Sequence, residues 1–173
     1  MYTGKITIKE TTVEDLDNIM NLWNNGEVMF YVGFPKGLGI TMDKLEKWLS
    51  GVNQNQYRKH YSIYADGIGY CGETYYEIDC INNLSALDIK LLPHAQGKGI
   101  AEFSLRFAIT QVFENKLATR AYVDPNPDNK SAWKLYHKLG FVSKSRPEFL
   151  EPYSVYLEIT EDEYKKWDKV AEN

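Results

Sequence analysis

The sequence predicts a mixed α/β (α+β) domain, and the order of its apolar patterns is the reason. Three strand-like segments, His60–Ala65, Ile68–Asp79 and Leu87–Leu92, follow one another with an Asp-Gly turn after the first, which predicts an antiparallel meander. A long helical pattern over Lys98–Asn115 then leads to the apolar run Thr119–Val123. A strand, helix, strand unit requires a parallel pair, so the sheet should be mixed.

Length and composition predict one globular domain covering residues 1–173. The chain is 43% hydrophobic and 25% charged, as is usual for a protein with an ordinary core. No stretch approaches 18 apolar residues, and Met1–Lys5 lacks the apolar segment of a secretory signal, so we expect a cytoplasmic protein without a membrane partner. A net charge of −4 argues weakly against nucleic acid and is compatible with a cationic amine substrate.

The two cysteines do not form a metal-binding or disulfide pattern. Cys71 and Cys80 are too few for a disulfide framework and do not make a CxxC pair. We therefore expect buried free thiols and no bound metal.

The N-terminal third predicts one strand and two helices. Lys5–Glu10 alternates apolar and polar residues, as a half-buried strand does. Thr12 and Asp15 form a capping-box pattern before a helix that should end near residues 24–26. Trp23, close to that helix end, fits either the core or a ligand groove. A second short helix should begin after Thr41 and end near Gly51.

The segment Glu27–Gly39 alternates aromatic residues with glycine and proline. This composition does not suit the interior of a helix or strand, so the segment should be a loop. Apolar side chains such as Phe30 and Phe34 on such a loop either cover an edge of the core or line a pocket.

Leu87–Glu102 carries the strongest local signal for function. Leu87–Leu92 predicts a buried strand, Pro93 ends it, and Gly97 and Gly99 precede the long helix. A glycine-rich turn at a helix N-terminus presents unsatisfied N–H groups and the positive end of the helix dipole, which together bind phosphate oxygens. Lys98 adds a positive charge.

The spacing excludes two common nucleotide motifs. A P-loop requires an earlier glycine and a hydroxyl residue after Gly99, and the dinucleotide fingerprint requires a glycine at Glu102. The remaining pattern is a hexapeptide that resembles the [Gln/Arg]-x-x-Gly-x-[Gly/Ala] acetyl-CoA signature of the GNAT N-acetyltransferase superfamily. Its residues are Gln96, Gly97, Lys98, Gly99, Ile100 and Ala101.

A second motif strengthens the resemblance because it lies one helix and one strand downstream. The pattern Asn-x-x-Ala-x-x-x-Tyr-x-x-x-Gly-Phe occurs at Asn129, Ala132, Tyr136, Gly140 and Phe141. In local terms it is a capped helix with a glycine at its C-terminal end. It is similar to the motif that follows the fifth strand in GNAT proteins, and the run from residue 124 to 129 looks most like aminoglycoside 6'-N-acetyltransferases and ribosomal-protein-alanine acetyltransferases.

The resemblance implies a fold and a cofactor. It implies a sheet of about seven strands with helices on both faces and a parallel pair that splays apart at the cofactor. Acetyl-CoA would then place its pyrophosphate on the N–H groups of residues 97–101 and its pantetheine arm against main-chain groups near Leu91 and Leu92. The loop between the first two helices would border the acceptor groove, which includes Trp23, Phe30 and Phe34.

The resemblance also assigns a role to Tyr136 as the proton donor to the coenzyme A thiolate, or as a donor that fixes the thioester. A phenol with a pKa of about 10 can protonate a thiolate whose conjugate acid has a pKa of about 8.5 at modest cost. The alternative is a tyrosine ring that only packs on the sheet. Asn129 either bonds the cofactor or only caps its helix.

The base that deprotonates the acceptor amine has two candidates. Glu73 lies in a predicted strand and serves as base, as anchor for a cationic amine, or as an ordinary solvated carboxylate. Asp88 interrupts an apolar strand and requires a partner if buried, for which Lys90 lies on the same face. His94 is expected at the surface. We favour Glu73 as the base, with Asp88 lining the substrate site.

These observations predict a direct, acetyl-CoA-dependent N-acetyltransferase for a primary amine of a small aminoglycoside-like or polyamine-like molecule. The alternatives are a protein N-terminal acetyltransferase, for which an open groove would be expected, and a non-catalytic acyl-CoA-binding module. We expect a monomer or homodimer, in which the aromatic segment Tyr153–Leu157 of a C-terminal strand Tyr153–Ile159 could pair with another chain.

Overall fold

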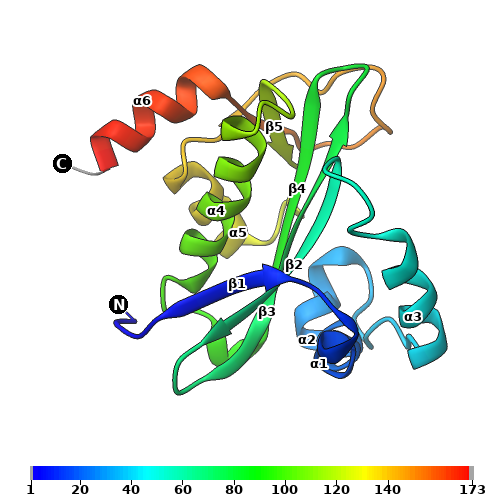
Figure 1. Cartoon of the computed structure of the whole chain (residues 1–173). Coiled ribbons are helices and arrows are strands. Elements are labelled where there is room, and N and C mark those ends of the chain that lie inside the picture. The colour runs from blue at the N-terminus through cyan, green and yellow to red at the C-terminus, as the bar shows by residue number, and fades with distance from the viewer. Residues whose placement is uncertain (1, 172–173) are drawn as a thin grey trace.

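The computed structural model describes residues 2–171 and consists of a seven-stranded sheet with helices on both faces (Figure 1). The strand order is β1-β2-β3-β4-β5-β7-β6. The strands are β1 (Ile6–Glu10), β2 (Arg58–Ala65), β3 (Gly69–Asp79), β4 (Leu84–Leu91), β5 (Arg120–Val123), β6 (Val142–Ser143) and β7 (Leu157–Thr160). The helices are α1 (Leu16–Trp23), α2 (Gly26–Met29), α3 (Met42–Gly51), α4 (Ile100–Glu114), α5 (Lys130–Lys138) and α6 (Glu161–Ala171).

The sheet confirms the predicted mixed topology. β1 to β4 form an antiparallel meander, and β4 pairs with β5 in parallel after the crossover through α4. β7 lies between β5 and β6 and is antiparallel to both. In Figure 1, α4, α5 and α6 lie on one side of the sheet and α1, α2 and α3 on the other.

The parallel pair is short and then separates. β4 and β5 pair only over residues 84–86 and 120–122, although β4 continues to Leu91. β5 cannot follow because the chain turns after Asp124 at Pro125 and Pro127, and proline has no N–H to donate to a sheet. The predicted splay is therefore present, and one edge of β4 is open beyond Ala86.

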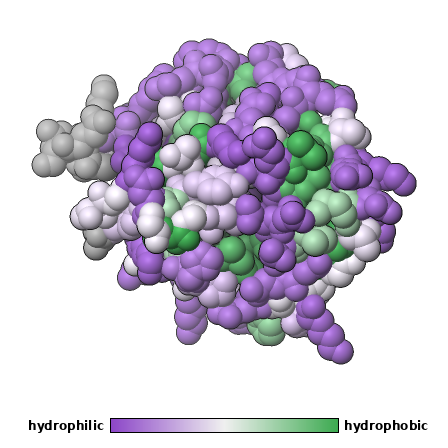
Figure 2. All heavy atoms as spheres, turned by 60° about the horizontal axis from the view of Figure 1, so that its bottom comes forward, coloured by the Kyte–Doolittle hydropathy of each residue, from purple (hydrophilic) through white to green (hydrophobic). Residues whose placement is uncertain are grey.

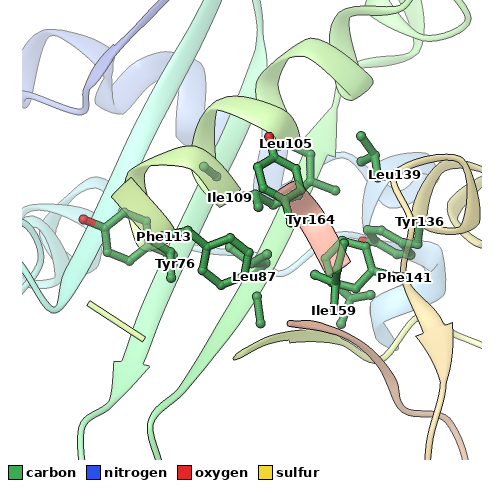
Figure 3. Close-up of a cluster of buried hydrophobic side chains, with 14 of the residues drawn as sticks. Tyr76, Leu87, Leu105, Ile109, Phe113, Tyr136, Leu139, Phe141, Ile159 and Tyr164 are labelled. Atoms are coloured by element: carbon green, nitrogen blue, oxygen red, sulfur yellow. The ribbon is translucent and has the colours of Figure 1, made fainter. Parts of the chain in front are cut away.

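The main core lies between the sheet and α4. Buried residues of α4 pack on β3, β4 and β5 and reach Tyr136, Leu139 and Phe141 at the end of α5 (Figure 3). A separate cluster holds α1 and α3 against the opposite face around Tyr70. Because both faces are covered, the sheet is a rigid support for side chains at the splay.

The face in Figure 2 is mainly hydrophilic, with hydrophobic side chains in several separate groups. Within the described residues, no helix combines the length and the apolar character needed to cross a membrane.

Several local predictions are corrected. The segment Glu27–Gly39 is not entirely loop, because Asn25 caps the one-turn helix α2 and a 3₁₀ turn follows over Phe30–Val32. Gly33, Gly37 and Gly39 come after these two helical turns, so they do not interrupt them. Both cysteines are free, but only Cys71 is buried, since Cys80 lies exposed at the turn between β3 and β4.

The C-terminal strand is shorter than predicted. β7 begins at Leu157, and Tyr153 lies in the loop before it. The segment is also not a free sheet edge, because β5 and β6 occupy both sides of β7. The edge strand over Tyr153–Leu157 that the sequence suggested for pairing with another chain is therefore not formed.

A bulge beside Gly72 accompanies a very close approach of β3 to the last residues of β4. The β2–β3 register shifts between Ile63 and Tyr64, opposite Gly72, which has φ +151°. A Cβ at this position would lie 2.0 Å from the carbonyl oxygen of Lys90. Only glycine allows this approach.

Gly72→Ala should destabilise the protein by about 3 kcal/mol, since the added methyl group collides with main-chain atoms that packing cannot move freely. Gly67→Ala is the matched control, because Gly67 has φ +73° in the hairpin turn but open space where its Cβ would be. The free energy of unfolding of Gly67→Ala should fall by only about 1 kcal/mol, the cost of placing alanine in a left-handed conformation. Urea unfolding measures both, and equal losses would contradict the close approach.

Candidate active site

A large cleft opens where β4 and β5 separate. Its volume is about 1670 Å³, which exceeds the roughly 300–1,000 Å³ of a site for one small ligand. Its walls come from residues between 26 and 35, Tyr75, β4, the turn before α4, residues 124–126, α5 and Tyr153. The cleft is therefore large enough for a long cofactor and a second reactant.

The glycine turn faces this cleft with its N–H groups free. Gly97 and Gly99 have φ +72° and +84°, left-handed values that suit glycine. Among the described residues, none accepts a hydrogen bond from the N–H groups of residues 97–102. In the same turn, the carbonyl of Lys98 accepts a hydrogen bond from the Tyr2 N–H at 3.1 Å, so this carbonyl group points toward the N-terminal segment. The turn can thus bind an anion as the sequence predicts.

The open edge of β4 offers main-chain groups, but not at Leu92. The Leu92 N–H donates to the Cys71 carbonyl at 2.8 Å, and the Leu92 carbonyl accepts from Ala95 at 2.9 Å. Since groups along a strand point alternately to its two neighbours, Ile89 and Leu91 face the splay instead. Gln96 folds back so that its Nε2 donates to the Leu91 carbonyl at 3.0 Å. We therefore move the expected pantetheine contact from Leu92 to Leu91 and Ile89.

Tyr136 lies on α5 between the core and the cleft. Its side chain is 6% exposed, packs edge-on against Phe141 at 5.9 Å and also lines the cleft (Figure 3). Burial raises the pKa of Tyr136 above the ordinary phenol value, and the charges of Asp88 and Asp124 raise it further. The hydroxyl is consequently protonated at neutral pH and available as a donor. The ring therefore packs in the core and also borders the cleft, and its role as proton donor stays a prediction.

Asn129 caps α5 and also borders the cleft. Its Oδ1 accepts from the Ala132 N–H at 3.1 Å, which confirms the capping role. The Asn129 side chain therefore has only its NH₂ group left for a cofactor.

Glu73 lies in a closed polar cluster beneath the cleft. It is 3% exposed and absent from the cleft lining. Trp23 Nε1 donates to both its oxygens at 2.8 Å, His60 Nε2 lies 2.9 Å away and Lys90 Nζ 3.3 Å away. Burial alone would raise the pKa of Glu73, but His60, Lys90 and Trp23 together lower it to about 2. A carboxylate this acidic and this enclosed is a poor base, which argues against the role we expected.

Asp88 occupies the position that Glu73 was expected to fill. Its side chain is 42% exposed, lines the cleft and pairs with Lys90. Burial alone would lower the pKa of Lys90, but Asp88 and Glu73 hold it above its usual value. Lys90 therefore stays charged, bonded to the enclosed carboxylate on one side and to the accessible one on the other.

The three aromatic residues expected in the acceptor groove have different positions. Phe30 is 57% exposed and lines the cleft together with Tyr31. Phe34 is exposed but lies outside the lining, and Trp23 is turned inward to Glu73. The Glu27–Gly39 segment does both of the things considered for it, because Met29 is buried while its neighbours line the cleft.

The sequence did not indicate several lining residues. Asp124 and Tyr153 border the cleft from the far side of the splay. Asp124 opens the proline-rich run and could have been noticed, since it follows directly on a parallel strand. Tyr153 carries no local signal, because only folding brings its loop to the cleft. Among residues 2–171, no group of three or more His, Cys, Asp or Glu side chains forms a metal site.

Comparison with known proteins agrees with this geometry. Residues 5–142 match the model of a family described as acetyltransferase (GNAT) domain. This protein belongs to the GNAT acetyltransferase family. It is accordingly an N-acetyltransferase that uses acetyl-CoA.

Two relatives with assigned names align along most of the GNAT chain. An aminoglycoside N(6')-acetyltransferase type 1 of Klebsiella pneumoniae is 23% identical over 96% of this chain and 88% of its own length. An uncharacterized N-acetyltransferase, p20, of Bacillus licheniformis is 23% identical over 82% of this chain and 81% of its own.

Solved structures share the GNAT fold. The spermidine N-acetyltransferase of Vibrio cholerae, crystallised with CoA and spermine, superposes with a TM-score of 0.78 and 23% identity, covering 92% of this chain and 98% of that one. A GNAT acetyltransferase of Streptococcus pneumoniae has a TM-score of 0.72 and 17% identity, covering 90% and 99%.

The Glu73 cluster predicts an acid-dependent loss of stability. Because the folded pKa is about 2 and the unfolded value is about 4.3, ionised Glu73 stabilises the native state fully above pH 5, and this contribution is lost as pH falls toward 2. Glu73→Gln should be less stable than wild type at pH 7, by a margin that narrows between pH 5 and 2. Urea unfolding across this range tests it. Glu77→Gln, at an exposed position of the same strand, is the control and should show no such trend. A stability difference between Glu73→Gln and wild type that stays constant from pH 5 to pH 2 would show that Glu73 is not held ionised by its neighbours.

Proposed function

We propose that this GNAT protein transfers the acetyl group of acetyl-CoA directly to a primary amine of a small cationic molecule. One observation carries the proposal: a single cleft joins the unpartnered N–H groups before α4 to Tyr136 and Asp88. The cofactor, the proton donor and the accessible carboxylate therefore share one space. We include in the proposal the cytoplasmic location and the monomeric or homodimeric state that the sequence suggested.

The turn at residues 97–101 would hold the pyrophosphate of the cofactor. Six consecutive free N–H groups at the start of α4, with Lys98 beside them, supply hydrogen bonds and positive potential. Lys134 and Lys138 of α5 face the same cleft and add positive charge. From there the pantetheine arm would follow the free edge of β4 at Leu91 and Ile89, which places the thioester between β4 and α5.

Tyr136 would assist the departure of the thiolate. Its phenol is more weakly acidic than in water, so proton transfer to a solvated thiolate would be unfavourable. A thiolate desolvated in the same pocket also becomes more basic, which restores the match. The amine nitrogen forms a bond to the thioester carbon, the carbon–sulfur bond breaks, and the sulfur takes the proton of Tyr136. The amine nitrogen then loses one proton, and the Tyr136 phenolate regains one from water, so the protein returns to its starting protonation state.

Asp88 would receive that proton or bind the ammonium form of the acceptor. It combines cleft exposure with a fixed position, because Lys90 pairs with its Oδ2 and the Ile89 N–H donates to its Oδ1 at 2.8 Å. The exposed part of Asp88 remains open to the acceptor or to a bridging water.

A covalent acyl-enzyme is not part of this proposal. Cys71 is fully buried and outside the cleft lining, and burial raises the pKa of its thiol, so the nucleophilic thiolate is disfavoured. Cys80 lies at the far turn of β3 and β4. Direct transfer is the route that remains for these residues.

A small cationic acceptor is favoured over a protein N-terminus by the charge of the cleft. Glu27, Asp88 and Asp124 line the cleft, and the last two remain 42% and 41% exposed although they pair with Lys90 and Arg146. Exposed carboxylates attract polyamines and aminoglycosides. The names of the relatives, which are an aminoglycoside acetyltransferase and a spermidine acetyltransferase, support this class.

The acceptor class is tested with acetyl-CoA and a panel of spermidine, kanamycin and short peptides with a free N-terminus, by following thiol release. We expect turnover with a polyamine or an aminoglycoside and none with the peptides. Peptide acetylation alone would assign the alternative function instead.

Tyr136→Phe should lower kcat about a hundredfold or more, since general-acid catalysis contributes on this scale, while coenzyme A binding measured by calorimetry should change little. Tyr76→Phe is a matched control, because Tyr76 is 3% exposed and its hydroxyl donates to the Gln56 carbonyl at 3.1 Å, outside the cleft lining. Equal kcat values for the two variants across the pH range would remove Tyr136 from the mechanism.

Asp88→Asn should reduce kcat/KM for the acceptor at neutral pH by about a hundredfold, and higher pH should recover part of it, because a pre-deprotonated amine needs no base. The measurement is the pH profile of kcat/KM. Asp79→Asn, at the far end of β3, is the control. An unaltered profile for Asp88→Asn would eliminate Asp88 as base and as anchor.

A further inference from the structure

A single buried arginine holds the long connection between β6 and β7 together. Arg146 lies in residues 144–156, which form neither helix nor strand, and its side chain is only 14% exposed. An arginine in a connection of this kind normally points to solvent. Its burial therefore requires partners for its charge and its hydrogen-bond donors.

The guanidinium of Arg146 bonds both ends of the segment 151–155. Its Nε donates to the Glu151 carbonyl at 2.7 Å, and its Nη1 donates to the Val155 carbonyl at 3.2 Å. The same Nη1 pairs with Asp124 Oδ2 at 3.0 Å. One side chain thus fixes the loop on itself and to the end of β5.

Three tyrosine rings surround this guanidinium. The ring centroids of Tyr122, Tyr153 and Tyr156 lie 6.0, 5.8 and 5.9 Å from its central carbon. Cation–π attraction on this scale adds about 0.5–2 kcal/mol for each well-placed ring. Tyr122 and Tyr156 also stack on each other at 5.3 Å. Among residues 2–171 no second aromatic ring pairs with Tyr153, so we take Arg146 as the partner that fixes its position.

Two groups held by Arg146 are also walls of the cleft. Asp124 and Tyr153 both line it, and Tyr153 is 43% exposed there. Asp124 is close enough for its charge to act on Tyr136. The wall that Arg146 supports is therefore the side of the cleft next to the proton donor and away from the phosphate turn.

We propose that Arg146 is a positioning residue for the acceptor: it fixes the Tyr153 ring and the Asp124 carboxylate as the wall against which a cationic amine binds. This inference rests on the proposed function. The exposed face of Tyr153 contacts the carbon chain or the ammonium group of the acceptor, while Arg146 itself does not touch it.

The test is a double-mutant cycle of Arg146→Met and Tyr153→Ala with spermidine and kanamycin as acceptors. Each single variant should raise the KM for the accepted amine about tenfold, while kcat and the KM for acetyl-CoA change less than about twofold. Because Arg146 acts through Tyr153 and Asp124, and Tyr153→Ala already removes the first of these two groups, the KM of the double variant should rise by less than about thirtyfold. A rise of about a hundredfold, the product of two independent effects, would overturn the proposal, and so would a loss confined to kcat.

Arg106→Lys is the matched control. Arg106 also combines an ion pair, with Asp168, and a ring contact, with Trp167 at 5.2 Å, but it lies on α4 outside the cleft lining. Its KM values should equal those of wild type. A rise of KM in this variant equal to that of Arg146→Met would show a general effect on stability and overturn the specific role.

A second readout does not depend on activity. Hydrogen exchange of the amides of residues 147–156 should become faster in Arg146→Met and stay unchanged in Arg106→Lys, even if no amine in the panel is acetylated. Faster exchange without turnover of any acceptor would refute the proposed function and keep only the structural part of the inference, in which Arg146 fixes the loop. Unchanged exchange would refute the positioning role alone.

Discussion

The separation of β4 from β5 is the constraint on which the site depends. Two prolines end β5 after four residues, whereas β4 remains paired with β3 as far as Leu91. The open edge of β4, the N-terminus of α4 and the middle of α5 consequently meet at one place. On the other edge of β4, Gly72 lets β3 approach the main chain of Lys90 more closely than a residue with a Cβ could. A cofactor with a phosphate end and an amide-containing arm fits the two kinds of free main-chain groups.

The two carboxylates that pair with Lys90 differ in burial and therefore in role. Lys90 lies between two carboxylates on the same face of the sheet, of which Glu73 is enclosed and Asp88 is accessible. The enclosed carboxylate stabilises the lysine and the indole of Trp23, and the lysine fixes the accessible carboxylate. A charged cluster of this kind fixes the position of a carboxylate at the cleft and still leaves part of that carboxylate exposed to a ligand. Arg146 does the same for Asp124 on the opposite wall.

The sequence predicted what depends on neighbouring residues. The phosphate turn, the helix that follows, the Asn129 cap and the parallel crossover all arise from local spacing and chain connectivity. The choice between Glu73 and Asp88 could not be made this way, because both lie in strands and their burial is decided by Trp23 and His60, which are distant in the chain. Tyr153 was placed in a strand, since its apolar surroundings suit one, but its contact with Arg146 holds it in a loop at the cleft.

The central claim is that the amides before α4 bind the diphosphate of the cofactor and that its arm runs beside β4 toward Tyr136. Hydrogen exchange resolved by residue, with and without coenzyme A, measures this most directly. The account predicts that coenzyme A slows exchange at residues 97–102 and at Leu91, where the free protein leaves these N–H groups unbonded or open to the splay. Protection confined to other segments, with residues 97–102 unchanged, would contradict it.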